Sequence, residues 1–391
     1  MAAVERLGAR ALELVLLGGI AINFAELYTK APGELLETGD FRPYFAGVTL
    51  SAALAIGLLL VGGRLRMGGW MVLLGVHFFL GRWMIHEAAP NPGIDVVTWQ
   101  REAIQSLQSG INPYGTSHPN FSPAAVYGSG MVVDGRVQIG LPYPPLSLLL
   151  ATASQALAGD YRFGLLGAML VTTLVIALAR PSRIATAAAL MFLSLPRSLL
   201  MLEGGWTEPF CLLLLAITVC CAIRAPRWTP VALGLLVAVK QYLFLALPLS
   251  LLLPRPPQGH RGQFGRALLV AAVITVPFVL WSPGGFWRDV VAMQLQQPFR
   301  RDALSFPAII ARLGGPILPS AIGFVGLAVL AMVGMVRLPR SPAGFAAALG
   351  GSLCGFFAFN KQAFANYYYF VIGALLLAVG TAGDEARSQV R

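Results

Sequence analysis

The chain has 391 residues, of which 57% are hydrophobic and 12% are charged, about half the usual charged share of a soluble domain. Its apolar runs approach the ~20 residues needed to cross a bilayer and recur along the whole sequence, which excludes a water-soluble domain. The net charge of +11 does not indicate nucleic-acid binding, because the basic residues form short clusters between apolar runs, as topology-determining residues do.

Apolar segments along the chain predict ten membrane spans. The first segment follows two basic residues, Arg6 and Arg10, and has no small-residue cleavage site after it, so an uncleaved span is expected. The predicted spans are 11–29, 43–62, 67–86, 163–179, 184–202, 209–223, 265–281, 316–336, 343–359 and 366–380.

Two further apolar stretches do not fit simple spans. A full crossing by 143–158 would move every later basic cluster to the outer face, so the positive-inside rule favours a segment that dips in and returns. The stretch 229–253 has basic turns on both flanks but is too short to cross twice. Two half-helices that meet near Lys240 are expected there, and such broken backbone is tolerated only where it is buried or lines a cavity.

With these assignments, both termini are predicted to be cytoplasmic. The outer face then receives 30–42, 87–142, 203–208, 282–306 and 360–364. In the longest of these loops, apolar residues recur at helical spacing from Asp95 to Ser109, which predicts an amphipathic helix in the membrane interface. Residues 131–137 predict a small hairpin with a turn at Asp134-Gly135.

Charged residues at the outer face are the candidate functional groups. Asp95 opens the amphipathic helix and is either an N-cap, a catalytic carboxylate, or both. Glu203 and Glu208 are either solvated residues at the end of a span or carboxylates that face a cavity. The cations Arg300, Arg301 and Lys361 depart from the positive-inside trend; they either snorkel or bind an anionic ligand.

Cysteine and histidine residues give weak signals. Cys211, Cys220, Cys221 and Cys354 lie inside apolar segments and predict packing rather than disulfides. A metal site from His86, Glu87 and His118 is poorly supported by their spacing, and we expect no metal.

Several short motifs, in this order, resemble a known family. A span is followed by Asp95 and an interfacial helix, then by Gly110-Ile111-Asn112-Pro113-Tyr114 and by Tyr143-Pro144-Pro145-Leu146. The region is similar to the GT-C superfamily of polyprenyl-phosphate-sugar-dependent glycosyltransferases, and within it to the mannosyltransferases of glycosyltransferase family 87. The Lys240 break, the 301–305 segment and the turn from Lys361 to Tyr368 extend the likeness over about 64–380.

The resemblance implies an all-α polytopic GT-C-like bundle of about 10–12 transmembrane helices with half-helices. Two extra spans (1–63) would precede a catalytic module (64–391). It implies inverting transfer of a hexose, with mannose expected, from a polyprenyl-phosphate sugar to a hydroxyl of a glycolipid or glycan. The reaction would take place on the periplasmic side of a bacterial inner membrane and need no cofactor.

The resemblance also assigns a role to Asp95, and the chemistry of a lipid-phosphate donor suggests roles for other residues. Asp95 is expected to be the general base, and Arg300, Arg301, Lys361 and Lys240 are expected to bind the donor phosphate. The residues expected to bind sugar or acceptor are Glu203, Glu208, Trp99, Asn112, Tyr114, Tyr143, Asn366 and Tyr367.

Two other classes of protein share some of these features. A secondary transporter also has broken helices and buried charges, but transporters often show paired halves, and this chain has none. A lipid-linked glycan flippase or ligase would share the lipid groove but would move whole glycans.

Overall fold

The computed structural model describes residues 2–383, except 121–122, 124–125 and 256–258. It is an all-α polytopic membrane protein, as predicted. Its helices are α1 (Ala2–Thr29), α2 (Arg42–Leu60), α3 (Gly63–Trp83), α4 (Asp95–Gln108), α5 (Pro145–Ala158), α6 (Arg162–Leu178), α7 (Arg183–Leu193), α8 (Ser198–Glu203), α9 (Glu208–Arg224), α10 (Thr229–Val239), α11 (Ala246–Leu249), α12 (Gly259–Trp281), α13 (Pro283–Phe286), α14 (Met293–Gln296), α15 (Phe306–Arg312), α16 (Ala321–Arg337), α17 (Pro342–Ala358) and α18 (Ala365–Thr381).

The helices differ in length. In the described part of the chain, four are long and apolar enough to cross a membrane alone, and they lie at Arg10–Thr29, Arg42–Leu60, Leu65–Ala88 and Gly259–Trp281. Six apolar helical segments are shorter, with 10–17 residues. The expected continuous span 184–202 is wrong: α7 ends at Leu193, and α8 begins only at Ser198. Pro196 lies in the break and has no amide hydrogen to continue a helix.

One of the two irregular apolar stretches, 229–253, has the break that the sequence predicts near Lys240; the other, 143–158, forms one continuous helix, α5, as far as Ala158. Helix α5 starts with Pro145 in its first turn and ends at Gly159, whose φ of 78° is left-handed. The next helix, α6, is bent from α5 by 105°. In the stretch 229–253, α10 ends at Val239. The next residue, Lys240, has an extended backbone (φ −156°, ψ 143°), and a 3₁₀ helix from Gln241 to Leu245 follows.

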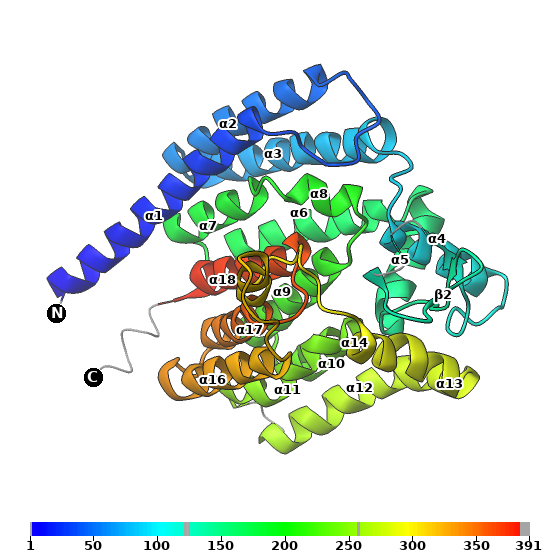
Figure 1. Ribbon diagram of the computed structural model, residues 1–391. Helices are drawn as coiled ribbons and strands as arrows, with labels where there is room; N and C mark the ends of the chain where they lie inside the picture. The colour runs from blue at the N-terminus through cyan, green and yellow to red at the C-terminus, as the bar shows by residue number, and fades with distance from the viewer. Residues whose placement is uncertain (1, 121–122, 124–125, 256–258, 384–391) are drawn as a thin grey trace.

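The two ends of the bundle differ. The start of α1 and the end of α18 lie at one end, and α4, the hairpin and α13 lie at the other (Figure 1). The hairpin joins β2 (Val132–Val133) to β3 (Arg136–Val137) through Asp134 and Gly135, whose φ values are both positive, as a tight hairpin turn requires. A third strand, β1 (His118–Pro119), which the sequence analysis missed, pairs with β3 on its other side.

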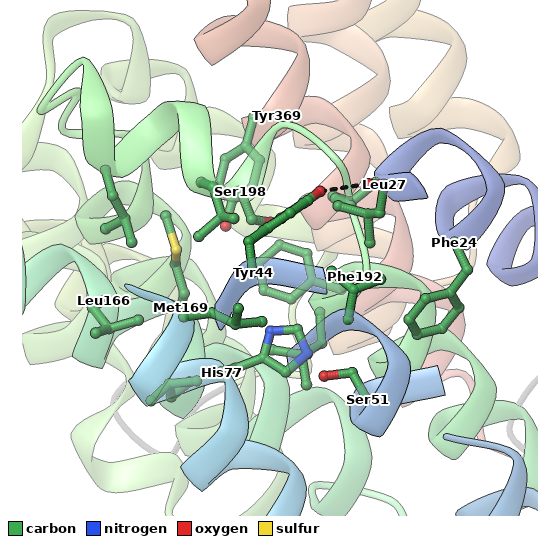
Figure 2. A pocket seen from close by; sticks show the side chains of 17 residues that line it. Phe24, Leu27, Tyr44, Ser51, His77, Leu166, Met169, Phe192, Ser198 and Tyr369 are labelled. Atoms are coloured by element: carbon green, nitrogen blue, oxygen red, sulfur yellow. Dashed lines mark hydrogen bonds between the residues drawn. The ribbon is translucent and has the colours of Figure 1, made fainter. Parts of the chain in front are cut away.

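Helices α1, α2 and α3 lie together along one side of the bundle and pack against α6 and α7 (Figure 1). A cavity of about 40 Å³ remains at this junction, and most of its lining is apolar. Figure 2 shows the Tyr44 hydroxyl donating a hydrogen bond (2.7 Å) to the carbonyl oxygen of Leu27, and His77 and Ser51, lower in the view, also line the cavity. The two N-terminal helices are thus part of the packed core.

Candidate active site

A buried arginine fixes the segment that leads to Asp95. Arg162, at the start of α6, is fully buried and donates hydrogen bonds to the carbonyl oxygens of Ile85, Ala89 and Pro90. Its guanidinium also binds the carboxylate of Asp160 at 2.8 Å. Because a buried guanidinium requires partners for all its donors, this network holds the end of α3 and the loop before α4 against α6.

Asp95 is the first residue of α4 and follows Ile94, whose backbone is extended. It therefore lies one position inside the helix rather than at the N-cap. One carboxylate oxygen accepts a hydrogen bond from the Tyr127 hydroxyl at 2.8 Å, and the other accepts one from the amide of Val96 at 2.8 Å. Burial raises the pKa of the Asp95 carboxyl, and these two hydrogen bonds and the charge of Arg300 offset only part of that rise. A raised pKa brings a carboxylate closer to the range of an efficient general base.

A polar cavity of about 260 Å³ lies in front of Asp95. Arg300 reaches it from the 282–306 loop, paired with Asp302 at 2.6 Å and with its guanidinium over the ring of Phe364 at 5.1 Å. The cavity is lined by Ile94, Asp95, Val96, Trp99, Val126, Tyr127, Tyr143, Trp206, Gln297, Arg300, Gln362, Phe364, Asn366 and Tyr367. A carboxylate and a cation thus share a small, mostly aromatic and polar chamber beside the start of α4.

A second cavity of about 310 Å³ adjoins the first and shares four lining residues with it, Tyr143, Gln297, Gln362 and Tyr367. Its polar side carries Lys240, Lys361, Gln241, Gln294, Ser320 and Asn360, and its other walls include Leu295, Phe324, Phe356 and Phe357. Leu295 is 69% exposed and Phe324 is 56% exposed, so these walls extend to the outer surface of the bundle.

Lys361 and Lys240 are held in different ways. The ammonium of Lys361 donates to the carbonyl oxygens of Leu295 (2.9 Å) and Gln297 (2.6 Å), and burial lowers its pKa. Lys240 lies in the break after α10, and its ammonium binds the Glu208 carboxylate at 2.6 Å and the Thr207 hydroxyl at 3.1 Å. Three tyrosine rings surround the same ammonium, Tyr143 at 4.7 Å, Tyr242 at 5.8 Å and Tyr367 at 5.9 Å.

Most of the residues predicted for the site meet at these two cavities. They are Asp95, Trp99, Tyr143, Lys240, Arg300, Lys361, Asn366 and Tyr367. Glu208 lines neither cavity but contacts Lys240, which does. Residues as far apart in the sequence as Asp95 and Tyr367 thus form one site.

Four other predicted site residues line neither cavity. Glu203 accepts hydrogen bonds from the amides of Glu34 (2.8 Å) and Leu35 (2.6 Å), so it anchors the loop between α1 and α2. The Asn112 side chain accepts from the Tyr114 amide, and the Tyr114 hydroxyl donates to the carbonyl oxygen of Tyr143 at 2.9 Å. Arg301 points to the exposed surface.

The sequence analysis missed several lining residues, namely Tyr127, Trp206, Gln241, Gln294, Gln297 and Gln362. Gln297 and Gln362 stand beside Arg300 and Lys361, so the clusters of polar residues in these two outer turns could have indicated them. Tyr127 follows Asp95 by 32 positions in a loop without periodicity, and no local pattern connects the two.

The residues considered for a metal site have other partners. His118 contacts Glu102, His86 packs against the ring of Phe163 at 5.3 Å, and Glu87 lies 3.6 Å from Arg82. Among the described residues, no group of three or more His, Cys, Asp or Glu side chains could hold a metal ion.

Comparison with known proteins supports the fold. No family model and no curated protein matches the chain. The structure is similar to the crystal structure of ArnT from Cupriavidus metallidurans bound to undecaprenyl phosphate, with a TM-score of 0.54 and 16% sequence identity. The match covers 84% of this chain and 62% of that one, so the chain spans about three fifths of the length of ArnT. At this identity the likeness is one of fold, and it confirms the predicted all-α polytopic membrane bundle.

Proposed function

We propose that the protein is a membrane glycosyltransferase that transfers a sugar from a polyprenyl phosphate to an acceptor hydroxyl. One observation carries the proposal: a buried carboxylate, Asp95, and the cations Arg300, Lys240 and Lys361 line two adjoining cavities, the second of which has aromatic and aliphatic walls. The sugar would occupy the first cavity, the phosphate the junction, and the isoprenoid tail the apolar side of the second. The ArnT structure, which contains undecaprenyl phosphate, supports this class of ligand for a shared fold.

In the proposed reaction, the acceptor oxygen attacks the anomeric carbon from the face opposite the phosphate. The bond between that carbon and the phosphate oxygen breaks, and its electron pair leaves with the polyprenyl phosphate. Asp95 accepts the proton of the attacking hydroxyl, and inversion follows from the single displacement. Lys240 and Lys361 stabilise the charge that develops on the phosphate. The transferred sugar is proposed to be a hexose, with mannose favoured by the sequence resemblance.

The proposed lipid site predicts a difference between two cations that are both in outer turns. Lys361→Gln should weaken binding of undecaprenyl phosphate by about 10- to 100-fold, because a charge-assisted contact is worth ~1.5–3 kcal/mol. Arg301→Gln is the matched control: Arg301 is exposed and lines neither cavity, so its loss should change binding less than about threefold. Equal effects of the two substitutions, measured as Kd on detergent-purified protein, would contradict the assignment of the phosphate to the junction of the two cavities.

The site is proposed to face the outside of a bacterial inner membrane. In a variant without the four native cysteines, Ser109→Cys, at the exposed end of α4, should react with a membrane-impermeant thiol reagent applied to intact cells. Ser182→Cys, at the exposed start of α7, should react only after the cells are permeabilised. The reverse labelling pattern would place the site in the cytoplasm.

A further inference from the structure

A buried carboxylate stands directly behind the central cation of the proposed lipid site. Glu208 is 0% exposed and binds Lys240, which is 4% exposed, at 2.6 Å. Lys240 and Asn366 line the cavities, whereas Glu208 does not. The carboxylate is fixed, because the same oxygen also accepts hydrogen bonds from the Asn366 amide at 2.9 Å and the Tyr242 hydroxyl at 3.4 Å. A ligand phosphate at Lys240 would therefore interact with the positive charge of Lys240 and with the negative charge of Glu208.

The proposed donor and product differ in charge. The phosphodiester of the donor carries one negative charge, and the phosphomonoester that remains after transfer carries about 1.5 to 2 at neutral pH. A site that contained only cations would hold the product more tightly than the donor, because the attraction grows with the ligand charge. Turnover would then be limited by release of the spent lipid.

Carboxylates offset the charges of two of the cations that line the cavities, Lys240 and Arg300. Lys240 is paired with Glu208, and Arg300 is paired with Asp302 and also acts through its charge on the carboxylate of Asp95, whereas Lys361 is bound to backbone carbonyl oxygens. The group with the greatest influence at the junction is Glu208, since it offsets the charge of Lys240 at 2.6 Å. The second negative charge of a phosphomonoester therefore adds little to the free energy of binding at Lys240.

We propose that Glu208 makes the site discriminate by charge, so that it disfavours the dianionic lipid product relative to the monoanionic donor and promotes product release. The inference rests on the proposed function. Glu208 is then a positioning residue that acts through Lys240 and does not touch the reacting atoms.

The titratable groups that face Glu208 keep their charge over the pH range of the tests below, so the phosphate of the ligand is the group that titrates in that range. They are Lys240, Cys211 on α9, Tyr242 after the break, Tyr143 before α5 and Tyr367 on α18. Tyrosine ordinarily titrates near ~10, and Cys211 is fully buried, where desolvation disfavours the thiolate, so these groups stay neutral between about pH 5.5 and about pH 8. The second ionisation of the phosphate falls inside that interval.

The first test uses the unmodified protein and two lipids that differ only in charge, undecaprenyl phosphate and its methyl diester. At about pH 8 the diester should bind at least as tightly as the phosphate. A site that prefers the phosphate by about tenfold or more would overturn the proposal. If neither lipid binds, the lipid site itself is wrong, and the proposed function fails with it. If both lipids bind but the phosphate binds more tightly, only the charge discrimination is wrong.

The second test removes the charge. Glu208→Gln should raise the affinity for undecaprenyl phosphate relative to the diester on the order of tenfold at about pH 8, and the change should shrink at about pH 5.5, where both lipids are monoanions. Glu203→Gln is the matched control, because Glu203 is equally buried at the other end of the 203–208 turn but lines neither cavity. A ratio that is unchanged in Glu208→Gln, or that changes equally in both variants or at both pH values, would overturn the proposal.

Discussion

Asp95→Asn is expected to reduce sugar transfer by ~10²-fold or more while thermal stability and lipid binding stay close to those of the parent protein. Asparagine has nearly the shape of aspartate; its carbonyl oxygen can accept the hydrogen bond from the Val96 amide while its NH2 group donates to the Tyr127 hydroxyl oxygen, so the start of α4 should stay in place. What it cannot do is take a proton from the acceptor hydroxyl. Single-turnover transfer with saturating donor is the measurement, and near-parental rates would exclude Asp95 as the base.

Tyr127→Phe is the milder partner of that substitution. It removes one hydrogen bond to the ionised Asp95 carboxylate, an interaction that lowers the Asp95 pKa against the effect of burial. Without it, the pKa rises further. Because the base must be deprotonated to work, transfer falls as the pH drops through this pKa, and in Tyr127→Phe the acidic limb of the rate profile should move to higher pH. A shift of the acidic limb to lower pH, or no shift, would show that Asp95 is not the group that accepts the proton.

Lys240→Met is expected to have the largest combined effect, on both stability and binding. It removes the cation between the cavities and leaves Glu208 buried without its ion-pair partner, a change that typically costs ~3–5 kcal/mol. We expect a markedly lower melting temperature and loss of measurable affinity for undecaprenyl phosphate.

A double variant separates these two consequences. Lys240→Met with Glu208→Met replaces the whole buried pair by apolar side chains of similar size, a change that is often neutral for stability. The double variant should regain most of the thermal stability but none of the lipid affinity. If lipid affinity returns together with stability, Lys240 acts only in packing and the phosphate is bound elsewhere.

The sequence predicted the helical class and the main breaks because their causes are local. Basic residues on both flanks of 229–253 required the break at Lys240, and Pro145 and Gly159 bound α5. The spacing of apolar residues located α4 to within one residue. The interruption of 184–202 was not predicted, because Pro196 alone does not tell whether a span bends or stops.

The candidate site was predictable only where a residue departs from a compositional trend. Cations on the outer face drew attention to Arg300 and Lys361, and both line a cavity. The same argument selected Arg301, its neighbour, which is exposed. Glu203 and Glu208 stand only five positions apart, yet one binds backbone amides and the other binds Lys240. Such differences depend on tertiary contacts, which the local sequence does not contain.

The central claim is that the two cavities bind and turn over a lipid-linked sugar. The direct measurement is incubation of the purified protein, in detergent and without any transmembrane gradient, with a panel of polyprenyl-phosphate sugars and glycolipid acceptors. We expect one donor to lose its sugar with formation of free polyprenyl phosphate and a glycosylated acceptor, and Asp95→Asn to abolish that loss. A protein that binds these lipids but turns over none of them, and moves them only across a sealed bilayer, would be a transporter or flippase and would contradict the account.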